Sequence, residues 1–165
     1  MSTPRIYLHI GAMKTGTKHL QNLMEVNADS LARAGYLFPV EHGWSDQVFA
    51  TREILRMTGD ARVRRRAEGK WDRVATQMLD HDGPASIFSM EFLSFAHRPG
   101  VRRIARSLEA ADVHVILTVR DAIGVIPAQW QTSARNGHTA SWREFAEQVM
   151  ADPPDPKSTG HKVFQ

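Results

Sequence analysis

The stretch IYLHIGAMKTGTKHL, residues 6–20, joins a strand pattern to a helix pattern through a loop that holds two glycines. Apolar, β-prone residues dominate positions 5–10, and Gly11 ends this run, which predicts a buried strand. From Thr17 onward apolar residues recur at helical spacing as far as Ala34, and Gly35 is a typical helix terminator. We therefore expect a strand, a glycine loop and a helix in direct succession.

The rest of the chain alternates between the same two patterns. Strands are expected at 84–90 (PASIFSM) and 112–121 (DVHVILTVRD), with a short extended piece at 36–39. Helices are expected at 45–58, 61–80, 99–111, 122–135 and 141–150, the last with Ser141 as its cap and Glu144 three residues on. Such alternation predicts an α/β fold of three layers, α/β/α, around a mostly parallel central sheet. Residues 1–150 are expected to form one domain, and the proline-containing segment 151–165 an irregular tail.

Composition narrows the classes of function. The 165 residues are 42% hydrophobic and 24% charged, with a net charge of +3, which is typical of an ordinary globular protein. The small positive excess suits an anionic small ligand and does not favour nucleic acid. The absence of cysteine excludes disulfides and thiolate chemistry. The first apolar run is too short for a signal peptide or a membrane span, so a cytoplasmic location is expected.

The glycine loop has the chemistry of an anion site. Gly11 and Gly16 allow backbone angles at which successive amides turn inward, and the helix from Thr17 directs its free amides to the same place. Lys14 adds a positive charge, and Thr15 and Thr17 add hydroxyl groups. The alternative is a plain glycine turn with a solvated lysine, but strand, loop and helix together favour phosphate binding.

The position of the lysine distinguishes subclasses of phosphate loop. The common nucleotide-binding loop carries its lysine directly after the second glycine, whereas Lys14 lies before Gly16. The segment LHIGAMKTGTKHLQ resembles the 5′-phosphosulfate loop of sulfotransferases of the bacterial and heparan type, whose usual form is P-K-[ST]-G-T. Those enzymes use 3′-phosphoadenosine 5′-phosphosulfate (PAPS) as donor. Met13 and Lys18 depart from the usual residues of that family.

This resemblance implies a fold, a reaction and a binding role for the loop. The fold would be P-loop NTPase-like, and a sulfuryl group would pass from PAPS to a hydroxyl group on a sugar, a lipid or a small metabolite. The 5′-phosphate would be held by the loop residues Lys14, Thr15, Gly16 and Thr17, joined by the amide of Lys18. Lys14 would also stabilise the charge that grows on the leaving phosphate. No metal ion is expected, because a sulfuryl group carries less charge than a phosphoryl group.

The resemblance also implies a second anion site, for the 3′-phosphate. In the family an arginine ends a central strand and a serine follows eight residues later; here Arg120 matches the arginine, but position 128 is alanine. A planar guanidinium suits this role because it binds two phosphate oxygens at once. Ser133 replaces the missing serine only if the helix bends near Pro127. The alternative for Arg120 is a structural ion pair with Asp121.

Transfer to a hydroxyl group requires a base, and Glu91 follows the expected strand 84–90 directly. The resemblance implies that Glu91 is this base, while a helix-start glutamate serving as a cap partner is an equal alternative. His97 is a weaker candidate, and His9 is interpreted as a satisfied residue at the end of its strand.

Three further interpretations remain open at the level of the sequence. The basic run 62–73 is typical of a solvated helix face, and the alternative is the border of a site for an anionic acceptor. A small-molecule kinase of the same fold class would be expected to have a lysine after Gly16 and metal-binding aspartates, which the sequence lacks. Sulfotransferases of this kind are normally longer, so a truncated or non-catalytic nucleotide-binding domain is the other alternative.

Overall fold

The computed structural model describes residues 3–39, 43–57 and 59–151. The chain divides into two compact units, Met1–Thr118 and Val119–Gln165. The first unit contains the sheet, and the second contains two helices within its described part. Apart from Ala151, the tail expected at 151–165 lies outside the described residues.

The sheet has four strands, all parallel, in the order β2-β3-β1-β4. They are β1 (Arg5–His9), β2 (Tyr36–Leu37), β3 (Ala85–Ser89) and β4 (Asp112–Ile116). β1 pairs with β3 on one side and with β4 on the other, so it is central. The carboxyl ends of parallel strands share one edge of the sheet, and the segments that follow β1, β3 and β4 therefore emerge together. The expected α/β class and parallel sheet are confirmed.

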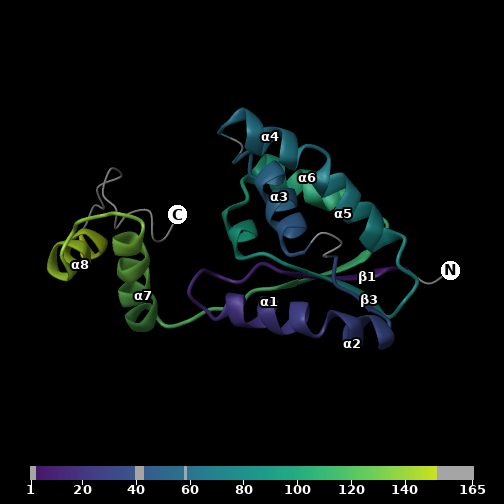
Figure 1. Ribbon diagram of the computed structural model, residues 1–165, viewed down its shortest axis with the longest axis horizontal. Coiled ribbons are helices and arrows are strands. Elements are labelled where there is room, and N and C mark those ends of the chain that lie inside the picture. The colour runs from purple at the N-terminus through teal and green to yellow at the C-terminus, as the bar shows by residue number, and fades with distance from the viewer. Residues whose placement is uncertain (1–2, 40–42, 58, 152–165) are drawn as a thin grey trace. The chain divides into compact units, whose positions relative to one another are not determined.

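Helices cover both faces of this sheet (Figure 1). One face carries α1 (Thr17–Val26) and α2 (Ala28–Arg33); the other carries α3 (Ser45–Ile54), α4 (Ala61–Ala67), α5 (Lys70–Leu79) and α6 (Arg98–Ser107). A short 3₁₀ helix, η1 (Glu91–Phe95), follows β3. The core lies mainly between the sheet and α3, α5 and α6, and its largest fully buried side chains include Trp71, Phe88, Ile6, Met78 and Leu108. This arrangement of layers agrees with the α/β/α expectation.

Two of the expected helices are broken. The helix expected from Thr17 to Ala34 ends at Asn27, whose side-chain amide donates to the carbonyl of Leu23 at 2.8 Å and competes with the backbone. The helix expected at 61–80 divides at Gly69, which has a φ of 71°. A left-handed glycine ends one helix and starts the next in a new direction. The strand expected at 112–121 ends at Ile116.

The second unit contains α7 (Ala122–Arg135) and α8 (Trp142–Met150). Asp121 caps α7 by accepting the amide of Gly124 at 2.6 Å. The Trp130 and Trp142 rings meet edge to face at 5.8 Å, and Phe145 of α8 is fully buried. The cap predicted for α8 is present, because the Ser141 hydroxyl accepts the Glu144 amide while the Glu144 carboxylate accepts the Ser141 amide. None of the helices in the described part of the chain has the length and apolar character needed to cross a membrane.

Candidate functional site

Backbone hydrogen bonds hold the start of the glycine loop to the neighbouring strand ends. The Ile10 amide donates to the Ile116 carbonyl at 2.9 Å, and the Ala12 amide donates to the Thr118 carbonyl at 2.8 Å. On the other side, the Met90 amide donates to the His9 carbonyl at 3.0 Å. The loop after β1 is therefore fixed against the segments that follow both β3 and β4.

Gly11 lies where no side chain fits. A Cβ at this position would be 2.5 Å from the Thr118 Oγ1 atom and 2.9 Å from the Thr17 Oγ1 atom. These distances are far inside van der Waals contact, so the loop approaches both hydroxyl groups only because residue 11 has no Cβ. This glycine brings the threonines of the loop and of the β4 end together.

The middle of the loop turns through two left-handed residues. Gly16 has a φ of 90° and Lys14 a φ of 66°. The left-handed conformation of Lys14 is rare for a residue with a Cβ and costs about 1–2 kcal/mol. Helix α1 begins directly after Gly16, as expected. Because the first amides of a helix have no carbonyl partner in their own helix, the Thr17 and Lys18 amides are suited to an anion.

The threonine hydroxyls brace the loop from within. Thr15 donates its hydroxyl hydrogen to the Ala12 carbonyl at 2.6 Å, and the same oxygen lies 2.9 Å from the Thr118 hydroxyl and 3.3 Å from that of Thr17. The hydroxyl expected to serve a phosphate therefore first stabilises the left-handed turn around Lys14. Thr17 is almost fully buried.

His9 connects the ends of β3 and β4. Its Nδ1 atom lies 2.8 Å from the Ser89 hydroxyl and its Nε2 atom 3.2 Å from the Thr118 hydroxyl, and the residue is 5% exposed. Burial lowers the pKa of His9, while the negative charge of Glu91 partly opposes this effect. The interpretation as a satisfied strand-end histidine agrees with these contacts, and they also place His9 under the loop.

Glu91 is held by an amide from α1. The Gln21 Nε2 atom donates to the Glu91 carboxylate at 2.9 Å and to the Ser89 carbonyl at 3.0 Å. Gln21 is 1% exposed, and among the described residues its Oε1 atom has no hydrogen-bond partner. Gln21 was not predicted as a site residue from the sequence. The sequence feature that could have indicated it is a polar residue directly after Leu20, in a helix that was predicted from its apolar residues.

The side chain of Lys18 contacts Trp44, whereas its main-chain amide is the group expected to bind phosphate. Its Nζ atom lies 4.1 Å from the centre of the Trp44 ring, a cation–π contact between α1 and the start of α3. The main chain of Lys18 belongs to the first turn of α1, as the expected role requires. Side chain and amide of this residue can therefore be tested separately.

Arg120 belongs to the second unit and does not end a strand, because β4 stops at Ile116. Its Nε atom lies 3.9 Å from the Asp121 carboxylate, and both side chains are more than half exposed. Thr118, which follows β4 within the first unit, contacts the loop through its carbonyl and its hydroxyl. Ser133 is buried in α7, and His97 is an exposed residue that precedes α6.

The described residues contain no group of three or more histidine, aspartate or glutamate side chains arranged to hold a metal ion.

The structure brings Lys14, Thr15, Gly16 and Thr17 together with Glu91 at one edge of the sheet of the first unit. No family model, curated protein or solved structure matches this chain, so the interpretation of the site depends on its own geometry.

Proposed function

We propose that the first unit is a P-loop NTPase-like domain that binds PAPS and transfers its sulfuryl group to a hydroxyl acceptor. The observation that carries this proposal is the left-handed turn at Lys14 and Gly16, which precedes α1 and is braced to Thr118. Strain of this kind persists where surrounding contacts enforce it, and here it shapes a loop whose charge and amides suit a phosphate.

The residues present fit the 5′-phosphate end of such a donor. The amides of Thr17 and Lys18 supply hydrogen-bond donors at the positive end of the α1 dipole, and Lys14 supplies a full charge. The donor, when bound, supplies an activated sulfuryl group on a phosphate leaving group. Lys14 would hold that phosphate and offset the charge that it gains during the reaction.

Glu91 is the proposed base. Gln21 fixes one oxygen of its carboxylate, which keeps the group in one orientation at the edge of the sheet next to the loop. Among the described residues its carboxylate bonds to the Gln21 amide rather than to an amide of η1, which favours the base over the cap alternative. Glu91→Gln is therefore expected to leave nucleotide affinity intact and to lower turnover by about 10²–10⁴-fold. Unchanged turnover would restrict Glu91 to a structural role.

Calorimetry with adenosine 3′,5′-bisphosphate tests the donor assignment. We expect this nucleotide to bind more tightly than ATP, and Lys14→Ala to weaken its binding by about tenfold or more. Lys18→Ala is the matched control in the same loop: it removes a cation that contacts Trp44 but keeps the amide, so affinity is expected to change little. Equal or tighter binding of ATP would exclude the PAPS assignment, and binding without turnover would indicate a non-catalytic domain.

Arg120 remains the expected ligand of the 3′-phosphate. Arg120→Ala is therefore expected to weaken binding of the 3′,5′-bisphosphate more than binding of adenosine 5′-phosphate, which lacks the second phosphate. An equal effect on both nucleotides would remove Arg120 from the 3′-phosphate site.

A further inference from the structure

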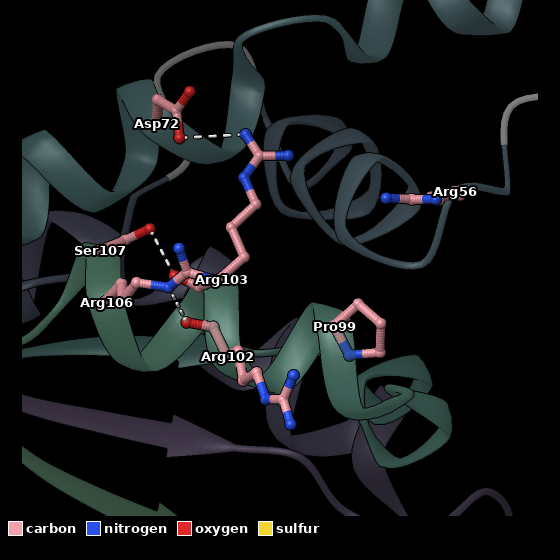
Figure 2. Close-up of a pocket in the computed structure, with 7 residues that line it drawn as sticks. All are labelled: Arg56, Asp72, Pro99, Arg102, Arg103, Arg106 and Ser107. Atoms are coloured by element: carbon pink, nitrogen blue, oxygen red, sulfur yellow. Dashed lines mark hydrogen bonds and ion pairs between the residues drawn. The ribbon is translucent and has the colours of Figure 1, made fainter.

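A cleft of about 490 Å³ lies on the helical face formed by α3, α5 and α6, and it shares no residue with the glycine loop. Four arginines line it: Arg56 after α3, and Arg102, Arg103 and Arg106 of α6. The remaining lining residues are Asp72, Pro99 and Ser107 (Figure 2). Its volume is within the range of small-molecule sites.

The charges in this cleft are not balanced. Arg103 donates to Glu53 at 2.7 Å and to Asp72 at 3.0 Å, and the second contact is drawn in Figure 2. The four arginines of the lining together with the two carboxylates that Arg103 contacts therefore leave an excess of two positive charges. In the part of the chain that the structure describes, Arg56, Arg102 and Arg106 form no ion pair with a carboxylate.

The walls of the cleft are held in place from the core. The Trp71 indole nitrogen donates to the Ser107 hydroxyl at 3.0 Å, and that hydroxyl donates to the Arg103 carbonyl at 2.8 Å. Trp71 is fully buried, and its own amide donates to Glu53, the partner of Arg103. The Arg103 side chain is therefore held by Glu53 of α3 and Asp72 of α5. Trp71 of α5 supports both Glu53 and the Ser107 hydroxyl.

Close packing between α6 and the end of α3 brings the arginines together. A Cβ at Gly100 would lie 3.2 Å from the Ile54 Cγ2 atom and 3.3 Å from the Ile54 carbonyl oxygen. The glycine therefore lets α6 approach the last turn of α3. Arg56 follows that turn and extends into the cleft from the side opposite α5 (Figure 2).

Arg56 also occupies a position that favours glycine. The Met57 amide bonds to the Arg52 carbonyl and the Arg56 amide to the Glu53 carbonyl, which is the Schellman pattern at the end of α3. Arg56 is its left-handed residue, with a φ of 56°. A second unfavourable feature is the spacing of Arg102 and Arg106, which places like charges one helical turn apart. Both features weaken the unliganded fold, and an anion in the cleft would offset the repulsion.

We propose that this arginine cleft binds a small molecule that carries phosphate or sulfate groups. Guanidinium groups bind such oxyanions through paired N–H donors, and an excess of two charges suits a dianion. The proposal is independent of the function assigned to the glycine loop, since the two sites share no residue.

The test is calorimetry of the full chain with inorganic pyrophosphate at about 0.15 M salt, where exposed charges are screened beyond ~8 Å. Arg102→Gln and Arg106→Gln are each expected to weaken binding by about tenfold or more. Arg33→Gln is the control, because it removes the same charge from α2, outside the cleft. Arg56→Gly is expected to weaken binding while raising the melting temperature, so its effect cannot come from unfolding.

Several results would overturn the proposal. These are an absence of pyrophosphate binding in the parent protein, an equal loss in Arg33→Gln, or a loss in Lys14→Ala that the cleft variants do not show. Sedimentation with anionic phospholipid vesicles separates a soluble ligand from a lipid headgroup. Capture by vesicles without binding of pyrophosphate would indicate a membrane-surface site and would also overturn it.

Discussion

At the scale of single residues, the site depends on a glycine with no space around it. Gly11→Ala places a methyl group 2.5 Å from the Thr118 hydroxyl oxygen, so the loop or the β4 end must move. We expect a loss of about 1–3 kcal/mol in the free energy of unfolding, measured with urea. Gly59→Ala is the control, because a Cβ there meets no atom of the described residues within 4 Å. Equal losses in the two variants would contradict the close approach at Gly11.

His9 provides a second test at this scale, through pH. Because burial lowers its pKa in the folded state, the unfolded chain takes up the proton first as the pH falls below about 6.5. The stability that neutral His9 contributes is therefore complete above that pH and is lost as the pH falls through the lower, folded pKa. Urea denaturation between pH 7.5 and 5 should show a smaller decline in His9→Gln than in the parent.

The electrostatic effect of Glu91 on His9 can be detected without any assay of activity. Glu91 raises the pKa of His9, so Glu91→Gln should lower that pKa further, as followed by the NMR titration of the His9 ring. Glu109→Gln, which removes an exposed carboxylate from the turn after α6, should leave the titration unchanged. A titration that is the same in both variants would show that Glu91 lies too far from His9 to act on it.

At the scale of elements, the cap of α8 is the most local structure that the sequence predicted, and the structure confirms it. Ser141→Ala removes the acceptor of the Glu144 amide, and Ser141→Thr keeps one. Loss of such a cap costs about 1 kcal/mol. Amide hydrogen exchange in α8 should therefore quicken by about fivefold in the alanine variant and change little in the threonine variant. An equal increase in both would mean that the hydroxyl does not stabilise α8.

The helices and strands also show which parts of the fold can be predicted from the sequence and which cannot. Apolar runs and helical spacing located β1, β3, α6, α7 and α8, because one periodic face decides each of them. Apolar spacing did not reveal the break at Asn27, since that break depends on a side-chain hydrogen bond to Leu23. The run at 112–121 suggested a strand ending at Arg120, but pairing with β1 decides its length, and the pairing ends at Ile116.

The same limit applies to the candidate site. The loop residues Lys14, Thr15, Gly16 and Thr17 form a contiguous motif, so the sequence could identify them. Thr118, His9 and Gln21 enter the site through contacts between residues far apart in the chain, which no local pattern records. Their roles depend on which segments the fold places side by side.

At the scale of the whole molecule, the division after Thr118 predicts where a protease acts. Residues 117–121 belong to no helix or strand, and Arg120 in this segment has a half-exposed side chain. Limited digestion with trypsin is expected to produce a fragment ending at Arg120 early, since exposed connections are cleaved before packed elements. Mass spectrometry identifies the fragment, and Arg120→Gln should abolish it. First cuts inside β1 (after Arg5) or inside α5 (after Lys70 or Arg73) would contradict the division into units.

The contacts of His9 also set an order of events during synthesis. Its ring is hydrogen-bonded to the side chains of Ser89 and Thr118, which lie 80 and 109 positions further along the chain. The glycine loop is made early, but on the ribosome it has no finished support until the end of β4 has emerged. Closing connections of this length is slow, because the intervening chain must be ordered before the contact forms. The loop therefore reaches its final shape late, so a nascent chain would gain the proposed capacity for nucleotide only when the first unit is nearly complete.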